Sequence, residues 1–171
     1  MSRKYLLASW VCGSILVLDQ GTKWWVQKNM ALHQSIEILP NFAHLTYIRN
    51  TGAAFGFFAE TQSSWRMLLF ILISIIAIGA ILYLMKNLPP KRNGQIVSLS
   101  LVLGGAAGNL IDRVRWGEVI DFIDLHWYHY HWPAFNIADS AITIGVILLL
   151  ILMSRKGSFD KPKLENRNSN R

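Results

Sequence analysis

The chain of 171 residues is long enough for one domain, and its single cysteine, Cys12, excludes an internal disulfide. Hydrophobic residues make up 52% of it and gather in four long runs, which excludes an ordinary water-soluble domain. The net charge of +7 would suit a nucleic-acid-binding protein. Most of the basic residues, however, lie next to the apolar runs or after the last one, which is typical of a membrane protein. We therefore expect no nucleic acid as a partner.

Each apolar run is about 20 residues long, enough to cross a hydrocarbon core of ~30 Å at ~1.5 Å per residue. The runs are 6–26, 67–85, 96–114 and 133–153. We expect an all-α membrane protein with four transmembrane helices, forming a single domain over residues 1–154. Most lysines and arginines lie before the first run, in the loop 86–92 or after residue 154, so both termini are expected in the cytoplasm. Residues 155–171 are expected to form a disordered, basic cytoplasmic tail.

The first run follows a basic Ser2-Arg3-Lys4 start, as a signal peptide would. It has no small-residue cleavage site and continues through Trp24-Trp25, so we expect an uncleaved helix. Near its outer end Asp19 and Lys23 are four residues apart, share one helix face and can pair. Two interpretations stay open: an ion pair that ends the span at the membrane surface, and a pair that braces a site on the outer side.

The loop after the first run predicts strands. Ile36 to Ile38 alternate, Phe42 to Ile48 are rich in β-branched and aromatic residues, and Pro40-Asn41 between them is a turn signal. An open strand edge is not stable in lipid, so we expect a small sheet on the outer face. The following segment, which contains Asn50 and Gly52, is either an ordinary turn or a close approach of the backbone that glycine permits.

The second and third runs differ in character. The second has only Ser74 as a polar interior residue and is expected to face lipid. In the third, Gly104 and Gly108 permit tight helix contact. Asn109, Asp112 and Arg113 follow on one face. A polar helix end is the simpler interpretation, but Asn109 lies a full turn inside that end, where an unpartnered amide is costly.

Residues 118–125 could add a third strand, on which Asp121 and Asp124 point to opposite faces. We expect one of them to face a shared site and the other to lie in solvent. The next seven residues, 126–132, hold three histidines and four aromatic residues. With no Cys and no HExxH spacing, an aromatic belt at the membrane surface is favoured over a metal site, so no metal or other cofactor is expected.

The fourth run is expected to begin at Pro133, which suits a first helical turn. Asn136, Asp139, Ser140 and Thr143 then form one polar stripe. Asp139 lies about two turns inside the run, without a basic residue in that run to neutralise it. It must pair with a group from elsewhere or hold a proton, and Asp121 is the expected partner.

Two carboxylates at the same depth near water suit an aspartyl protease, because two close like charges cannot both ionise easily and one keeps its proton. The ionised carboxylate can activate water while the protonated one donates to the peptide carbonyl. Two other classes stay open. A proton- or cation-handling membrane protein would need carboxylates at several depths, whereas these gather toward the outer side. A non-catalytic lipid-binding or assembly protein would need the polar stripes but no shared proton.

Five motifs in order closely resemble the bacterial lipoprotein signal peptidase family, also called signal peptidase II. They are Asp19…Lys23, Asn50-x-Gly-Ala-Ala-Phe-Gly, Gly104-Gly-Ala-x-Gly-Asn-x-x-Asp-Arg113, Val119-x-Asp121-Phe122 and Phe135-Asn-x-Ala-Asp139. The resemblance covers roughly residues 15–145. It implies that Asp121 and Asp139 are the catalytic pair. It also implies that eight residues support the site and the substrate: Asp19, Lys23, Asn50, Gly52, Gly108, Asn109, Arg113 and Asn136.

The same resemblance implies an aspartyl endopeptidase of the bacterial inner membrane, with its active site near the periplasmic face. Its fold would be four transmembrane helices with a small periplasmic β-cradle and a short periplasmic helix, here near 57–65. Its substrates would be prolipoproteins whose cysteine already carries diacylglycerol, cut just before that cysteine. It would act in contact with membrane lipid as a monomer, and globomycin-type cyclic peptides would inhibit it.

Overall fold

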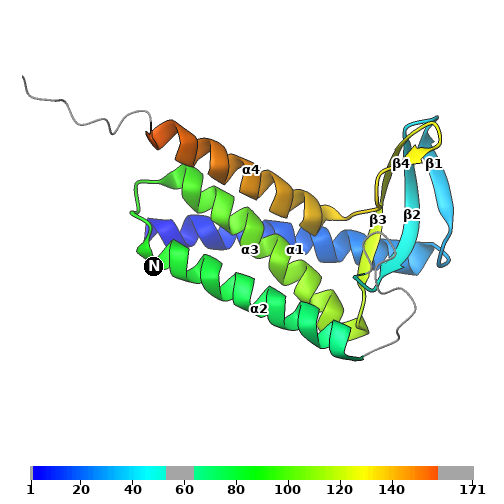
Figure 1. Cartoon of the computed structure of the whole chain (residues 1–171), viewed down its shortest axis with the longest axis horizontal. Coiled ribbons are helices and arrows are strands. Elements are labelled where there is room, and N and C mark those ends of the chain that lie inside the picture. Colours follow the sequence, from blue (N-terminus) through cyan, green and yellow to red (C-terminus); the bar gives the residue numbers. More distant parts are fainter. Residues whose placement is uncertain (1, 53–63, 158–171) are drawn as a thin grey trace, which may run out of the picture.

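The computed structural model describes residues 2–52 and 64–157 and consists of a helix bundle with a small sheet at one end (Figure 1). The helices are α1 (Arg3–Asn29), α2 (Ser64–Asn87), α3 (Asn93–Trp116) and α4 (Ile137–Gly157). The strands are β1 (Ser35–Leu39), β2 (Ala43–Asn50), β3 (Val119–Trp127) and β4 (Tyr130–His131). The start of α1 and the end of α4 lie together at the end of the bundle that is farthest from the sheet (Figure 1).

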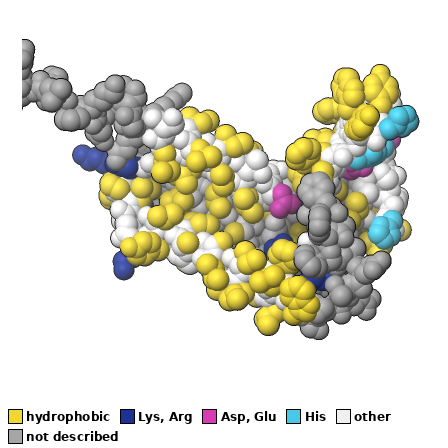
Figure 2. All heavy atoms as spheres, in the orientation of Figure 1, with side chains coloured by type: hydrophobic (Ala, Val, Ile, Leu, Met, Phe, Trp, Pro, Cys, Tyr) yellow, Lys and Arg dark blue, Asp and Glu magenta, His cyan; other side chains and the backbone are white. Residues whose placement is uncertain are grey.

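Three of the helices are long and apolar enough to cross a membrane: Trp65–Asn87, Asn93–Trp116 and Ile137–Ser154. Helix α1 is the longest at 27 residues but does not meet the same measure of hydropathy and charge. Hydrophobic side chains cover most of the bundle surface seen in Figure 2. Helix α2 is the most exposed, with Leu72, Ile73 and Ile76 all more than half exposed, as expected of a helix that faces lipid.

Small residues let α3 lie close to two neighbours. A Cβ on Gly104 would meet the Cβ of Ile15 in α1 at 2.9 Å, and one on Gly105 would meet the backbone carbonyl of Ala138 in α4. Gly108, one turn later, faces Asp19 of α1. The tight contact predicted from the Gly104 and Gly108 pair is therefore confirmed, and α1 is its partner.

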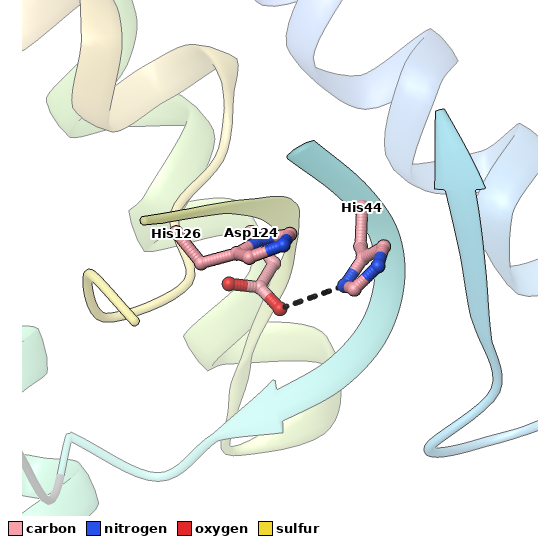
Figure 3. Close-up of side chains that lie close together, drawn as sticks. All are labelled: His44, Asp124 and His126. Carbon is pink, nitrogen blue, oxygen red and sulfur yellow. Dashed lines mark ion pairs between the residues drawn. The ribbon is translucent and has the colours of Figure 1, made fainter. Parts of the chain in front are cut away.

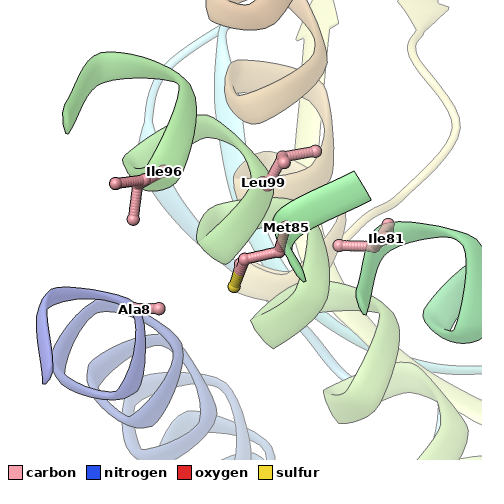
Figure 4. Packing of buried hydrophobic residues seen from close by; sticks show 5 residues of the cluster. All are labelled: Ala8, Ile81, Met85, Ile96 and Leu99. Atoms are coloured by element: carbon pink, nitrogen blue, oxygen red, sulfur yellow. The ribbon is translucent and has the colours of Figure 1, made fainter. Parts of the chain in front are cut away.

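The bundle end away from the sheet is closed by an apolar cluster of five buried residues: Ala8, Ile81, Met85, Ile96 and Leu99 (Figure 4). They come from α1, α2 and α3. Beside them the buried Lys4 donates to the carbonyl oxygens of Lys86 at 2.9 Å and Leu88 at 2.8 Å. A lysine at the start of α1 thus satisfies backbone carbonyls at the end of α2, where a positive charge is favourable.

The sheet is antiparallel in the order β1-β2-β3-β4. The two strands predicted around Pro40-Asn41 and the third over 118–125 are confirmed, and Asn41 has the positive φ of 56° that such a turn uses. β4 was not predicted. The sheet packs on the end of α1 through an apolar cluster of Val26, Met30, Tyr47, Ile120 and Phe122.

The predicted start of the fourth helix is wrong by one turn. Phe135 pairs with Ile123 of β3 in an antiparallel bridge, so the chain stays extended past Pro133, and α4 begins only at Ile137. Asp139 therefore lies in the first turn of α4 and not two turns inside it. The helix runs to Gly157, past the expected domain boundary at 154. The expected short helix near 57–65 falls largely outside the described residues, as does the tail from 158 onward; Ser64 and Trp65 belong to α2.

Candidate functional site

Asp121 is the buried carboxylate of the site, 2% exposed, and lies in β3. Its Oδ2 accepts a hydrogen bond from Nδ2 of Asn50 at 2.9 Å, and its Oδ1 accepts one from Nδ2 of Asn136 at 2.7 Å. Burial raises the pKa of Asp121 to about 6, and the charge of Asp139 acts in the same direction, against the two amide hydrogen bonds. Asp121 is thus a carboxyl group that can keep a proton close to neutral pH.

Asp139 is the half-buried carboxylate, in the first turn of α4. Its Oδ1 accepts a hydrogen bond from Nδ2 of Asn109 at 2.8 Å, and its Oδ2 accepts one from the backbone N–H of Asn136 at 3.2 Å. A negative charge is favourable at a helix N-terminus, where backbone N–H groups lack partners. The carboxylate of Asp139 is therefore stabilised by the start of α4, although its own apolar run contains no cation.

Asn136 joins the two aspartates. It is fully buried at the residue that precedes α4. Its side-chain amide donates to Asp121, to Oδ1 of Asn109 at 3.2 Å and to the carbonyl of Ile120 at 3.2 Å, while its Oδ1 accepts from the backbone N–H of Asp139. Asn136 thus contacts both carboxyl groups, Asp121 through its side-chain amide and Asp139 through its backbone N–H, and the charge of Asp139 acts on Asp121.

A second layer of charge lies behind the pair, around Lys23 of α1. The ammonium group is 2.9 Å from Oδ2 of Asp19, 2.8 Å from Oδ2 of Asp112 and 3.0 Å from Oδ1 of Asn109. Lys23 and Asp19 are 2% and 0% exposed, so the pair lies inside the protein, which favours the interpretation of a pair that braces a site. The other oxygen of Asp19 accepts the backbone N–H of Ala138 at 3.0 Å, which fixes the start of α4 against α1.

Sequence reasoning did not assign Asp112 or Gln20 to the site. Gln20 donates to Oδ1 of Asp112 at 2.9 Å and to Oδ2 of Asp19 at 3.1 Å, and Oδ2 of Asp112 accepts the backbone N–H of Ile120 at 3.3 Å. The available signal was the offset of three between Asn109 and Asp112, which places both on the face of α3 that meets α1. For Gln20 the sequence contains no such signal.

One turn at the end of β2 holds the supporting residues Asn50 and Gly52 in position. Oδ1 of Asn50 accepts the backbone N–H of Gly52 at 2.8 Å, so the amide nitrogen of Asn50 points to Asp121. Gly52 has a φ of 90°, and the ring of Phe70 occupies the space a Cβ would need. Only glycine fits this backbone without strain. The close-approach interpretation of this segment is confirmed for the residues through 52.

Arg113 is less directly engaged. Its guanidinium lies over the ring of Phe70, 5.4 Å from the centroid, and Nη1 is 3.5 Å from Oγ of Ser74. Its charge interacts favourably first with Asp139 and then with Asp112 and Asp121. Arg113 therefore supplies positive potential at the edge of the carboxylate pair from the side of α2.

The other face of β3 carries Asp124, as the strand periodicity predicts, but the expectation that Asp124 is solvated is wrong. It is 3.0 Å from Nδ1 of His131 and 3.8 Å from Nδ1 of His44. The aromatic residues of 126–132 are exposed, as expected of a belt, whereas His126 is only 7% exposed. Of the residues described, one group, His44, Asp124 and His126, is close enough to share a metal ion, and it is not at the carboxylate pair.

The site therefore consists of two coupled carboxyl groups, one buried and one half-buried, both held by asparagine amides. Such a pair can share one proton and act as acid and base on a single substrate group. Asp19 of α1 and Asp112 of α3 accept the backbone N–H groups of Ala138 and Ile120, the residues that precede Asp139 and Asp121. In Figure 2 an acidic side chain is visible in the hollow between the bundle and the sheet.

Comparison with known proteins identifies the group to which the chain is similar. A family model described as Signal peptidase (SPase) II matches residues 11–155. A lipoprotein signal peptidase of Syntrophus aciditrophicus is 48% identical over 91% of this chain and 97% of its own length. One of Geobacter sulfurreducens is 50% identical over 85% of this chain and 89% of its own length.

Solved structures agree with the sequence matches. A bacterial membrane enzyme solved by the in meso method at 2.3 Å has a TM-score of 0.79 and 38% identity over 91% of this chain and 92% of that one. A second, solved at 1.9 Å, has a TM-score of 0.76 and 39% identity over 85% of this chain and 91% of that one. With its three apolar helices the chain is a multi-pass membrane protein and a peptidase, and it belongs to the signal peptidase II family.

Proposed function

We propose that this protein is a membrane aspartyl endopeptidase that removes the signal peptide from diacylglyceryl-modified prolipoproteins by cutting before the lipidated cysteine. Membership of the signal peptidase II family supports the substrate class. The single observation that carries the mechanism is the pair Asp121 and Asp139, linked by Asn136, in which Asp121 is buried with its pKa raised to about 6. A shared proton on two carboxyl groups is the working part of an aspartyl protease.

The proposed reaction uses one water and returns both carboxyl groups to their starting state. Asp139, which reaches solvent, takes a proton from the water as the water oxygen attacks the scissile carbonyl carbon. Asp121, where burial favours the proton, donates it to the carbonyl oxygen. When the tetrahedral intermediate collapses, Asp139 gives its proton to the leaving amine nitrogen and Asp121 regains one from the hydroxyl group. The products are the signal peptide with a free carboxyl end and the lipoprotein with a free amino end.

The supporting residues have distinct parts in this proposal. Asn50, Asn109 and Asn136 hold the carboxyl groups in the orientation that the two proton transfers need. Lys23 and Asp19 set the depth and direction of α4 through Ala138. Arg113, whose charge interacts favourably with both aspartates, would bind the substrate backbone or stabilise negative charge on it. Gly52 and Gly108 allow the backbone to come close.

The proposed membrane placement has all four helices crossing the inner membrane, α1 included, with both termini in the cytoplasm. The sheet and the carboxylate pair then lie at the periplasmic face. Basic residues near the end of the bundle away from the sheet, such as Arg3, Lys91 and Arg92, support this orientation. Exposed Trp127 and Trp132 at the sheet suit a membrane–water interface. Reporter fusions at the C-terminus and within 115–132 test it, and a periplasmic C-terminus would contradict it.

The proposed partners are the lipidated precursors, the surrounding lipid and globomycin-type cyclic peptides as inhibitors. One chain carries both aspartates, so a monomer is sufficient for the chemistry. A substrate with two acyl chains can reach the site by lateral diffusion in the membrane. We therefore expect an unlipidated precursor to be cut much more slowly than the diacylglyceryl form.

The deciding experiment incubates the purified chain with a prolipoprotein in its diacylglyceryl and unmodified forms, and identifies the new N-terminus by mass spectrometry. The proposal expects cleavage immediately before the lipidated cysteine and strong inhibition by globomycin. Cleavage elsewhere, or equal rates for the two substrate forms, would contradict the proposed specificity. Full activity in a folded Asp139→Asn protein would remove the aspartyl mechanism.

A further inference from the structure

Four side chains with metal-binding chemistry lie on one face of the sheet. His44 of β2 is directly opposite Asp124 of β3, and His126 of β3 is directly opposite His131 of β4. Asp124 and His126 are two apart on one strand and share a face. The register therefore brings His44, Asp124, His126 and His131 together, on the face of β3 opposite to that of Asp121.

Three of these side chains, His44, Asp124 and His126, lie close together in Figure 3. Ligand atoms of His44, Asp124 and His126 all lie within 4.8 Å of one another. The ring of His126 stacks between those of His44 and His131, with centroid distances of 4.3 Å and 4.7 Å. Asp124 is reached from two sides, by Nδ1 of His44 at 3.8 Å and by Nδ1 of His131 at 3.0 Å.

His126 gives a second, independent observation at this cluster. Its residue is 7% exposed, and its Nδ1 is buried without a hydrogen-bond partner among the residues that the structure describes. A buried polar atom left without a partner costs free energy. Coordination would satisfy that nitrogen. His126 is one of the three residues whose ligand atoms lie within 4.8 Å of one another, so the unsatisfied nitrogen belongs to a side chain of the cluster (Figure 3).

We propose that His44, Asp124 and His126 bind one Zn²⁺ or a similar divalent transition-metal ion, and that His131 orients the carboxylate of Asp124 from outside. Two imidazoles and one carboxylate are a ligand set that zinc accepts, with the fourth position open. Bond lengths of ~2.0–2.1 Å put neighbouring ligand atoms roughly 3.4 Å apart, so the ligand atoms, now within 4.8 Å of one another, would move closer, and the stacked rings of His44 and His126 would turn so that one nitrogen of each faces the ion. Nδ1 of His131 lies 3.0 Å and 3.2 Å from the two carboxylate oxygens of Asp124, and carboxylates that bind a metal are in turn hydrogen-bonded.

The ion would join strands β2 and β3, which come from parts of the chain on either side of α2 and α3. It would lie on the sheet face opposite to the one that carries Asp121. This site is therefore independent of the proposed peptidase chemistry, and either proposal can fail without the other. Its expected effect is on the stability of the sheet, since an ion that binds only the folded chain stabilises that state.

The test measures Zn²⁺ binding to the full chain in detergent micelles, prepared without a polyhistidine tag, by isothermal titration calorimetry. Binding of Co²⁺, followed by visible absorption, reports the coordination. We expect one ion per chain. His44→Gln, Asp124→Asn and His126→Gln should each raise the Kd for Zn²⁺ by more than about 100-fold, and His131→Gln by roughly 10–100-fold, the usual effect of losing an outer partner.

His129→Gln is the matched control, because His129 lies in the same segment but is exposed and outside the cluster. It should leave the Kd unchanged. Thermal unfolding of each variant without metal checks that it folds, and the half-exposed His131 gives a variant whose folding should be unaffected. The proposal is overturned if the folded wild-type chain binds no Zn²⁺ stoichiometrically. It is equally overturned if His129→Gln weakens binding as much as His131→Gln does.

Discussion

Asn136 and Asp139 exchange two hydrogen bonds across the start of α4. The backbone N–H of Asp139 donates to Oδ1 of Asn136 at 2.9 Å, and the backbone N–H of Asn136 donates to Oδ2 of Asp139 at 3.2 Å. This is the reciprocal geometry of a capping box, in which the residue before a helix and the third residue of the helix satisfy each other. Because the amide of Asn136 also donates to Asp121, the same cap sets the relation between the two carboxyl groups.

Asp121→Asn and Asp139→Asn should each nearly abolish turnover in a protein that still folds. Asparagine keeps the size of the side chain but cannot exchange the proton, so kcat should fall much more than substrate affinity. The double variant should be little worse than either single one, because groups that act as a unit are not additive. Glu37→Gln, an exposed carboxylate of β1, is the matched control and should leave kcat unchanged. Additive losses in the double variant would argue against a shared proton.

The raised pKa of Asp121 predicts the alkaline limb of the pH profile. The proton of the pair is lost as the pH rises through about 6, so kcat/KM should fall above that value, with an apparent pKa that belongs to the pair. The hydrogen bond from Asn50 lowers the pKa of Asp121, so Asn50→Ala should move this limb to higher pH. A shift to lower pH in Asn50→Ala would contradict the assignment. Steady-state rates across a pH series, measured for the unchanged protein and for Asn50→Ala, test both expectations.

Lys23→Met should be strongly destabilising. It removes the ammonium group between Asp19 and Asp112 and leaves buried carboxylates without a counter-charge, a change that costs about 3–5 kcal/mol. The midpoint of thermal unfolding in detergent should fall, and adding Asp112→Asn should recover part of the loss. Lys28→Met removes an exposed lysine one turn further along α1 and should change the midpoint little. Equal midpoints for the two lysine variants would show that the buried network contributes no stability.

Two glycines of the bundle should respond oppositely to alanine. A Cβ on Gly108 would meet Oδ2 of Asp19 and lie 3.1 Å from its Cγ, so Gly108→Ala should displace that carboxylate and cost about 1–3 kcal/mol. A Cβ on Gly13 meets nothing within 4 Å. Gly13→Ala should therefore be neutral or stabilising by up to about 1 kcal/mol, because alanine favours the helix. Thermal unfolding and cleavage rate should both separate the two variants.

Patterns within one segment were readable from the sequence. Hydropathy predicted helices where α2 and α3 lie, and the alternation around Pro40-Asn41 predicted the first two strands. The start of α4 was not readable, because Pro133 is acceptable in a helix and the chain is kept extended by its pairing with β3, which includes the bridge from Phe135 to Ile123. That bridge joins a strand and a loop whose pairing no local periodicity encodes.

The site was predictable as a set of polar residues but not as a network. Asp19 and Lys23 were identified as a pair, yet they also contact Gln20 and Asp112, which contact each other between α1 and α3. His44 and His126 came together only through the register of β2 on β3, which a sequence does not show. Contacts between distant segments depend on how the elements pack. Sequence reasoning therefore missed the residues, such as Asp112 and Gln20, that reach a site from another element.

Helix α1 is held at both ends by lysines with specific acceptors: Lys4 on the carbonyls that end α2, and Lys23 between two carboxylates. Roughly five helical turns separate them, and each inserted residue would turn the later part of the helix by about 100° and lengthen it by ~1.5 Å. The contacts of the two lysines therefore fix the number of residues between them. An ordinary membrane anchor tolerates one residue more or less, whereas here one added residue would leave one of the two lysines facing the wrong side.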